Sequence, residues 1–179
     1  MSRAEGVNPA TCFAPVAAPT ARLLLLGSLP GIASLAAGEY YAHPRNAFWR
    51  ILATITGVPH DAPYADRIAA VQAAGIALWD VLASGVRPGS LDASIERSSI
   101  VVNDFARFFA THPGIEWVGL NGAKAAVEFR RHVGPLGLIP PERCRQLPST
   151  SPAHAAMRFE DKAAVWRAFC GSGASRAGS

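Results

Sequence analysis

The sequence predicts an α/β fold, a three-layer α/β/α sandwich around a central, mainly parallel sheet of four strands. Short apolar runs, typical of strands buried on both faces, alternate along the chain with segments whose apolar residues recur at helical spacing. This alternation is typical of a parallel sheet with helices on both faces. Clusters of polar, glycine or proline residues follow directly after the apolar runs. They would therefore meet at the carboxyl edge of the sheet, where open α/β folds bind ligands.

The first half of the domain is expected to contain one strand and two helices. Residues 22–26 form a continuous apolar run of strand length. Asn46 stands directly before AFWRILATI, whose helical pattern ends at Gly57. Residues 64–74 (YADRIAAVQAA) form a second amphipathic pattern, and Gly75 would close this helix as a C-cap.

The second half is expected to contain three strands and three helices. The strand IALWDVL (76–82) ends near Asp80 and precedes a loop through Arg87, Gly89, Ser90 and Asp92. Asn103 can cap a helix that runs to about residue 110. The remaining expected elements are a strand at 115–120 that ends at Asn121-Gly122, a helix at 123–132, a Gly/Pro loop at 134–141, a strand at about 143–147 and a helix at about 159–169.

Length and composition indicate one domain. The chain has 179 residues, close to the commonest domain size, and half of them are hydrophobic, which is enough for a single core. Residues 1–20 are rich in alanine and proline and are expected to form an extended lead-in. The domain would span residues 21–171, and the Gly/Ser-rich residues 172–179 are expected to form a disordered tail.

The charge balance weakly favours a polyanionic partner. There are 17 Lys and Arg residues against 13 Asp and Glu residues, and Lys124 and Lys162 are the only lysines. Arginine binds phosphate as a bidentate fork, so such a surface suits nucleic acid. A GC-rich genome, which encodes arginine in place of lysine, would explain the same composition.

Several classes of protein are excluded by missing patterns. The three cysteines lie far apart without a C-x-x-C pair, and the five histidines lack metal-ligand spacing, so no metal is expected. G-x-G-x-x-G, P-loop and G-x-S-x-G motifs are absent, and no cofactor is expected. With no signal sequence and no apolar run near the ~20 residues of a membrane span, we expect a cytoplasmic protein.

Four segments together carry a family resemblance. They are GSLPG at 27–31, AHPRNAFW at 42–49, Asn121-Gly122 after a strand, and STSPAH at 149–154. In this order and spacing they resemble the uracil-DNA glycosylase superfamily, and more closely its mismatch-specific branch and the hypoxanthine-DNA glycosylase family. LWDVLASGVRPGSLDASI also resembles the middle segment of that family. The resemblance covers about residues 22–154.

The resemblance implies a DNA glycosylase domain that extrudes a damaged nucleotide and hydrolyses its N-glycosidic bond. The expected substrates are deaminated bases in DNA, hypoxanthine first and uracil second, as in base excision repair. No lysine stands in the motifs to form a Schiff base with the sugar, so a monofunctional enzyme without lyase activity is expected. A monomer is expected, with DNA as its partner.

The resemblance assigns catalysis to Asn46. The superfamily usually carries an Asp or Asn that activates water within its first motif, where this chain has Ser28 and Leu29. Asn46 is the nearest substitute, because an amide can align water and stabilise charge through its dipole. The alternative is that Asn46 only caps the helix that follows it.

The remaining assignments concern the base and the DNA backbone. Tyr41 would line the floor of the base pocket and Phe48 would stack on the flipped base, although Phe48 also fits a core position. Asn121 would read the base edge, although Asn-Gly is also a common turn. Asp80, at its strand end, could anchor the loop or belong to the site, and the structural interpretation is preferred. The full base-binding set is Gly27, Ser28, Leu29, Gly31, Tyr41, Phe48 and Asn121.

The expected DNA-binding residues lie in two loops. His43 and Arg45 could contact a phosphate or orient their own loop, and the segment 149–154 corresponds to the loop that grips phosphates. Many uracil enzymes have a histidine where Ser149 stands, which argues against efficient uracil excision, and Ala153 would be a small wedge. The full set is His43, Arg45, Ser149, Thr150, Ser151, Pro152, Ala153 and His154.

Three other functions remain open at this stage. One is a uracil-specific enzyme with an atypical first motif. Another is a catalytically silent nucleic-acid-binding module that kept the fold. The last is an enzyme that hydrolyses free nucleosides.

Overall fold

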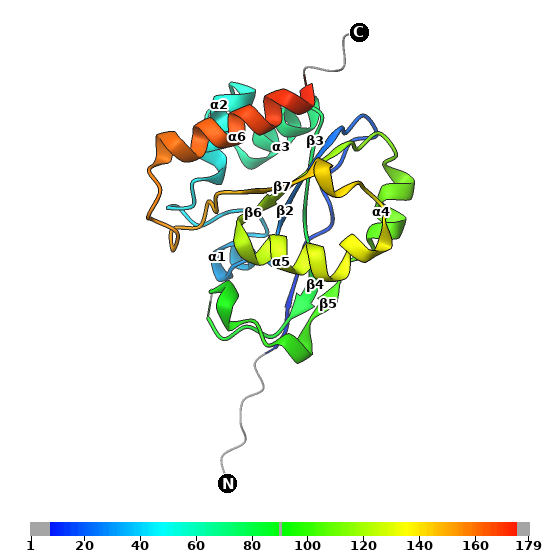
Figure 1. Ribbon diagram of the computed structural model, residues 1–179. Helices are drawn as coiled ribbons and strands as arrows, with labels where there is room; N and C mark the ends of the chain where they lie inside the picture. Colours follow the sequence, from blue (N-terminus) through cyan, green and yellow to red (C-terminus); the bar gives the residue numbers. More distant parts are fainter. Residues whose placement is uncertain (1–7, 90, 175–179) are drawn as a thin grey trace.

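A central parallel sheet organises the protein, as the computed structural model shows for residues 8–89 and 91–174 (Figure 1). Its strand order is β3-β2-β6-β7, and all three pairings are parallel. The strands are β2 (Leu23–Gly27), β3 (Ile76–Asp80), β6 (Trp117–Asn121) and β7 (Cys144–Leu147). β2 lies between β3 and β6, and all five of its residues are buried, as expected for a strand covered on both faces.

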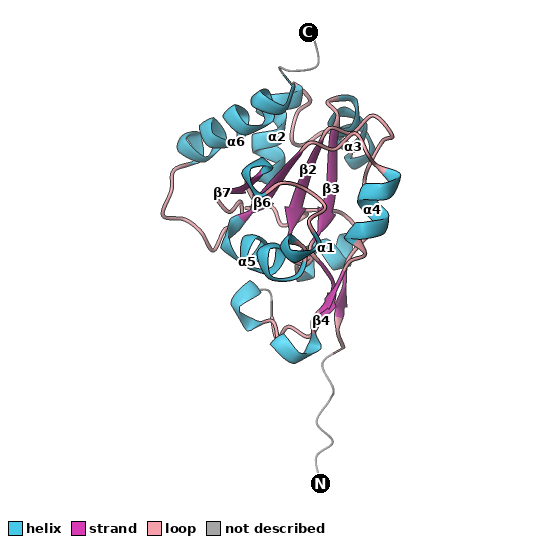
Figure 2. Cartoon of the chain, turned by 45° about the vertical axis from the view of Figure 1, so that its right-hand side comes forward, coloured by secondary structure: helices cyan, strands magenta, loops and turns pink. Residues whose placement is uncertain are grey.

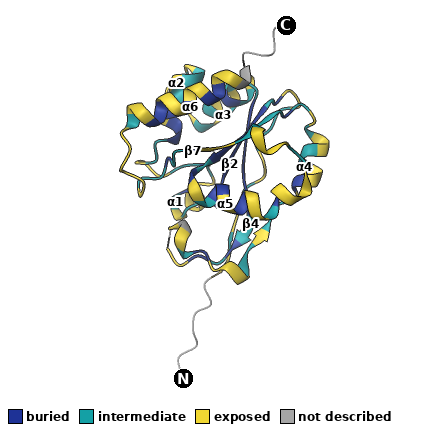
Figure 3. Ribbon diagram, viewed as in Figure 1, coloured by how far each residue is buried: buried dark blue, intermediate teal, exposed yellow. Residues whose placement is uncertain are grey.

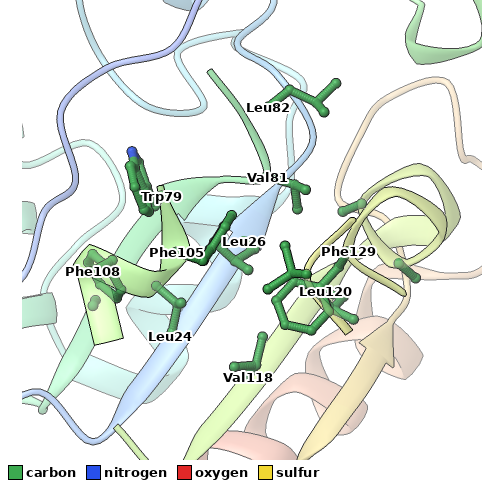
Figure 4. Packing of buried hydrophobic residues seen from close by; sticks show 14 of the residues in the cluster. Leu24, Leu26, Trp79, Val81, Leu82, Phe105, Phe108, Val118, Leu120 and Phe129 are labelled. Carbon is green, nitrogen blue, oxygen red and sulfur yellow. The ribbon is translucent and has the colours of Figure 1, made fainter. Parts of the chain in front are cut away.

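The alternation of side chains along β2 separates two hydrophobic layers. Leu23 and Leu25 pack against α2 (Phe48–Thr56), α3 (Tyr64–Ala73) and α6 (Phe159–Ala174). On the opposite face, Leu24 and Leu26 pack with side chains of α4 (Phe105–Thr111) and α5 (Gly122–His132), including Phe105, Phe108 and Phe129 (Figure 4). The predicted three-layer α/β/α fold with a parallel four-stranded sheet is therefore confirmed. The buried sheet between half-exposed helices is seen in Figure 3.

A second, smaller sheet is the main feature that the sequence did not predict. It contains β1 (Ala10–Thr11), β4 (Leu82–Gly85) and β5 (Val101–Val102) in the antiparallel order β1-β4-β5. The expected strand 76–82 is in fact two strands. β3 ends at Asp80, and the chain then follows the loop after β2, because Val81 N donates to Gly27 O and Leu82 N to Ser28 O.

Several boundaries also differ from the expectations. Asp104, rather than Asn103, caps α4, since the Asp104 carboxylate accepts from Arg107 N at 3.0 Å. The Asn103 amide instead donates to Asp80 O at 2.8 Å. A short helix, α1 (Ile32–Ala37), was not expected, and four 3₁₀ turns lie at Asp92–Ser94, Arg97–Ser99, Gly134–Leu136 and Pro141–Arg143.

The ends of the domain differ from the expected division as well. α6 continues to Ala174, into the expected tail, while residues 175–179 lie outside the described part of the chain, as do residues 1–7 and Ser90. The described part of the lead-in contacts the core, because Val16 forms a β-bridge with Leu78 and Phe13 packs on Tyr40. No helix among the described residues has the length and apolar character needed to cross a bilayer.

Packing between α2 and α6 supports the carboxyl edge of the sheet. Trp166 of α6 is fully buried, its ring meets Phe48 of α2 edge-on, and its indole N–H donates to Pro148 O at 3.0 Å. This bond ties the segment after β7 to the helical layer. Figure 2 shows the β2 and β3 arrowheads pointing to the end of the sheet where α1 lies.

Gly119→Ala in β6 should destabilise the protein by about 1–3 kcal/mol, a typical cost of overpacking. A Cβ there would lie 2.7 Å from Phe169 and 2.8 Å from Leu25, both of which are buried. Gly171→Ala in α6 is the matched control, because its Cβ would meet no atom within 4 Å and helix propensity favours alanine by about 1 kcal/mol. Thermal and urea unfolding would measure both, and equal stability of the two variants would contradict this packing.

Candidate active site

A cavity of about 530 Å³ opens at the carboxyl edge of the central sheet. Its walls come from the segments after four strands, together with α1, the start of α5 and the loop that precedes α2. The lining residues are Gly27, Ser28, Leu29, Pro30, Gly31, Ile32, Ala33, Ser34, Tyr40, Tyr41, His43, Asn46, Asp80, Arg87, Leu91, Ala93, Asn121, Gly122, Ala123, Lys124, Ser149, Thr150, Ser151, Pro152, Ala153 and His154. The predicted convergence of the segments after the strands is therefore found.

The first loop (residues 27–31) depends on the glycine at its start. A Cβ on Gly27 would lie 2.5 Å from Asp80 Oδ1 and 2.9 Å from the Tyr41 phenolic oxygen. Only glycine lets both oxygens approach the backbone this closely. The buried Arg87 guanidinium holds the loop by donating to the carbonyls of Leu29 and Pro30.

Tyr41 provides the aromatic surface of the cavity, and Phe48 stands behind it. The two rings are stacked, with centroids 3.8 Å apart and planes at 18°. Phe48 has no exposed surface and does not line the cavity, so the prediction that Phe48 itself contacts a base is wrong for this structure. Tyr41 has a φ of 55°, a left-handed conformation that costs energy in a bulky residue and recurs at functional sites.

Asn46 reaches the cavity and also orders the start of α2. Its Oδ1 accepts from Phe48 N at 2.9 Å, two residues ahead, and its own N–H donates to His43 O. The next residue, Ala47, donates to Thr150 O at 2.9 Å, which joins this segment to the loop after β7. Asn46 therefore bonds to the first residue of the helix as an Asx turn but is not the expected N-cap, because α2 begins at Phe48, its N-cap position is Ala47, and no side chain caps it.

Asn121 and Thr150 form a reciprocal pair. Asn121 Nδ2 donates to Thr150 Oγ1 at 2.9 Å, and Thr150 N donates to Asn121 Oδ1 at 3.0 Å. Thr150 is almost fully buried, so these bonds are shielded from water. Both ends of the Asn121 amide are thus occupied by the protein, and in this structure the side chain holds the loop after β7.

The second loop (residues 149–154) is a tight polar turn. Ser149 Oγ accepts from Ser151 N, and Ser151 Oγ accepts from Ala153 N, both at 3.2 Å. Lys162 of α6 donates to the His154 carbonyl at 2.6 Å, and burial lowers the pKa of this lysine. Ala153 and His154 are exposed at the tip of the loop.

Three charged side chains that the sequence did not assign to the site line the cavity, namely Asp80, Arg87 and Lys124. Asp80 is only 4% exposed and lines the cavity at the end of β3. Burial, and after it the charge of Asp80, raises the pKa of the neighbouring Tyr40 phenol. The position of Asp80 at a strand end was the available signal, and nothing in its local pattern distinguished a site residue from an anchor.

Lys124 of α5 is another of these charged side chains. Its Nζ donates to Glu128 Oε1 at 2.6 Å, one helical turn away. Burial opposes ionisation of Glu128, but Lys124, Arg131 and His132 outweigh it and lower the pKa of that carboxyl. The lysine therefore lines the cavity as one member of an ion pair.

The exposed predicted residues are divided between the cavity and the surface. His43 lines the cavity, whereas Arg45 does not, and Arg45 N donates to His43 Nδ1 at 3.1 Å. Apart from Arg45 and Phe48, every predicted site residue lines the cavity. Across residues 8–89 and 91–174, no three His, Cys, Asp or Glu side chains are grouped so that they could hold a metal ion.

Comparison with known proteins gives concordant similarities. The family model for the uracil DNA glycosylase superfamily matches residues 14–170. A Methanosarcina barkeri protein named hypoxanthine DNA glycosylase is 38% identical over 114 residues, covering 63% of this chain and 71% of that protein. A Methanosarcina acetivorans protein of the same name is 32% identical over 158 residues, covering 87% of this chain and 94% of that protein.

A solved structure is similar over almost the same length. It is the solution NMR structure of a Methanosarcina acetivorans protein named as a uracil DNA glycosylase. The two structures have a TM-score of 0.73 and 30% sequence identity, over 90% of this chain and 99% of that one. The residues matched by the family model, 14–170, include all the segments that build the cavity.

Gly27→Ala should disturb the cavity, because the added Cβ would force Asp80 or Tyr41 away from the first loop. We expect a loss of about 1–3 kcal/mol in stability and displaced NMR signals of both residues. Gly31→Ala is the matched control in the same loop, since its Cβ would meet nothing within 4 Å. Indistinguishable spectra for the two variants would argue against the close approach at Gly27.

Thr150→Val should loosen the second loop, because valine has the shape of threonine but lacks the hydroxyl that accepts from Asn121 Nδ2, so that only the backbone bond to Asn121 Oδ1 remains. The expected cost is about 1–3 kcal/mol, as for a buried polar group left unsatisfied, with faster amide exchange at residues 149–154. Thr150→Ser keeps the hydroxyl and should retain slow exchange. If the valine variant exchanges as slowly as the wild type, the pair does not hold the loop.

Proposed function

The chain belongs to the uracil DNA glycosylase superfamily, and we propose that it is a monofunctional DNA glycosylase for deaminated bases, hypoxanthine first and uracil second. It would hydrolyse the N-glycosidic bond in DNA, leave an abasic site and so begin base excision repair. The observation that carries this proposal is that the segments resembling the family motifs surround one cavity, with Asn46 in its wall. That cavity is large enough for a flipped nucleobase.

The reaction requires a positioned water and stabilisation of a developing positive charge on the sugar. Water adds to C1′ of the deoxyribose as the bond to the base nitrogen breaks, and the departing base takes up a proton. The first loop offers Ser28 and Leu29 in place of an acid. Asn46 would therefore position the water, because an amide oxygen has two lone pairs and Phe48 N–H uses one of them. Its dipole would also stabilise the sugar cation.

The base would be held between backbone and an aromatic ring. The first loop presents its backbone, and Tyr41, braced by Phe48, presents a ring to the same space. Stacking on an aromatic ring contributes about 1–3 kcal/mol per base in other nucleic-acid complexes. This assigns to Tyr41 the stacking role that the sequence pattern suggested for Phe48.

The second loop and the cavity rim would bind the DNA backbone. The loop at 149–154 supplies hydroxyl and backbone N–H groups, while His43, Arg45 and Lys124 supply positive or ionisable groups nearby. Phosphate contacts make binding weaker as salt concentration rises. The pairing of Lys124 with Glu128 supports hydrolysis alone, because the lysine amine in the cavity wall is already bound by a carboxylate.

The preference for hypoxanthine rests on two supports. Both curated relatives carry the name hypoxanthine DNA glycosylase. In addition, Ser149 stands where many uracil enzymes have the histidine that stabilises the uracil anion. A uracil-specific enzyme is the alternative with the same type of activity, and a catalytically silent DNA-binding module is the alternative of another functional class.

Asn46→Ala should lose excision by about 100-fold or more and keep DNA affinity, because the water would no longer be positioned. Single-turnover cleavage of oligonucleotides with one deoxyinosine, deoxyuridine or deoxyxanthosine, followed by alkali, would measure the rates. The alanine should also cost about 1 kcal/mol of stability through the lost contact with Phe48 N.

Asn46→Ser is the matched control for the contact with Phe48 N, because serine keeps a side-chain oxygen that can accept from the start of the helix. Normal stability with lost excision in the serine variant would support catalysis by Asn46. Full activity in either variant would remove Asn46 from the mechanism. Wild-type protein that binds DNA but cleaves no lesion would favour the silent module.

A further inference from the structure

We propose that Asp80 recognises the damaged base, its carboxylate accepting a hydrogen bond from the ring N–H that deamination creates. Adenine and cytosine carry a lone pair at N1 and N3, respectively. Their deamination products, hypoxanthine and uracil, carry an N–H at the same positions. A carboxylate is an acceptor only, so it can distinguish the two states of that nitrogen. This inference rests on the proposed excision activity and adds the group that selects the substrate.

The position of Asp80 suits contact with an extruded base. Asp80 ends β3 directly opposite Gly27, the last residue of β2, in the parallel register. Its Oδ1 stands 2.5 Å from where a Gly27 Cβ would lie, and the Tyr41 phenolic oxygen stands 2.9 Å from the same point. The carboxylate, the first loop and the Tyr41 ring thus bound one side of the cavity together. A base stacked on Tyr41 would bring its edge toward Asp80.

The two asparagines of the cavity are less suited to this task. Asn121, the base reader expected from the sequence, uses both ends of its amide to hold Thr150. Asn46, in the segment before α2, binds Phe48 N through its oxygen, whose other lone pair the proposed mechanism assigns to the water. As a carboxylate, Asp80 would offer a charged acceptor, and hydrogen bonds to charged acceptors are about twice as strong as neutral ones.

The backbone around Asp80 holds it in place before any base arrives. Its carbonyl accepts from Asn103 Nδ2 at 2.8 Å. The next residue, Val81, donates to Gly27 O at 2.9 Å and accepts from Asn103 N at 3.1 Å. A fixed, nearly buried acceptor is more selective than a mobile one. The carboxylate of Asp80 could not rotate away from the ring-nitrogen lone pair of an undamaged base. Adenine and cytosine would then meet repulsion at their unprotonated ring nitrogen.

The test uses deoxyinosine and N1-methyldeoxyinosine in otherwise identical duplexes. The methyl group removes the N1–H and leaves the sugar and the imidazole ring unchanged. Single-turnover rates would be measured for wild type, Asp80→Ala, Asp80→Asn and the control Asp61→Ala, whose side chain is exposed in the loop before α3. Binding of a duplex with a tetrahydrofuran abasic analogue, which has no base, would report whether each variant is folded and holds DNA.

We expect the wild type to cleave deoxyinosine at least about 10-fold faster than its methylated form, as the loss of a bond to a charged acceptor implies. Asp80→Ala should slow deoxyinosine by about 10- to 100-fold and the methylated substrate by much less, so that the ratio falls toward one. Asp80→Asn should give an intermediate ratio, and it replaces the alanine variant in the comparison if that variant fails to bind the abasic duplex. Asp61→Ala should match the wild type.

Two results would overturn the inference. One is an equal loss of both rates in the Asp80 variants, which a purely structural role would give. The other is no change of either rate in the Asp80 variants. In both cases wild-type excision of deoxyinosine would leave the proposed function intact. A wild type that cleaves no lesion would refute the proposed function itself, and the inference with it.

Discussion

The close approach at Gly27 is the constraint on which the site depends. β2 and β3 end side by side, and a carboxylate and a phenol occupy the space that a side chain on Gly27 would fill. This contact sets the position of Tyr41, whose ring in turn covers Phe48 and so links the cavity to the helical layer. The end of β2 therefore determines which side chains of the α/β sandwich can face a ligand.

The sheet and its helices could be predicted because burial on both faces leaves a strong pattern of short apolar runs. The second sheet could not, since β4 continues from β3 without a turn residue and pairs with strands of only two residues. The cap of α4 lies one residue later than the sequence predicts, and this too depends on contacts between distant residues. Asn103 and Asp104 are adjacent and equally suited to capping, and only the tertiary contact of Asn103 with Asp80 O decides between them.

The same limit applies to the site. The sequence pattern indicated which loops converge, because loop position follows from strand direction, and nearly all the expected residues line the cavity. The pattern could not indicate which of these side chains faces the cavity and which lies buried behind another. Phe48 and Tyr41 are both aromatic, and which of them faces the cavity depends on the left-handed backbone conformation of Tyr41. No local sequence pattern predicts that conformation. Asn121 fits a base reader in isolation, and only its distant partner Thr150 shows that its amide is occupied.

Charge at the base edge bears on which base leaves easily. A carboxylate such as Asp80 would favour binding of a ring N–H but would oppose negative charge on the departing base. Hypoxanthine can avoid that charge by taking up a proton on its imidazole ring before it leaves. Uracil has no basic ring nitrogen and departs as an anion, and Ser149 cannot supply the stabilisation that a histidine would. Asp80 and Ser149 would thus both favour departure of hypoxanthine over departure of uracil.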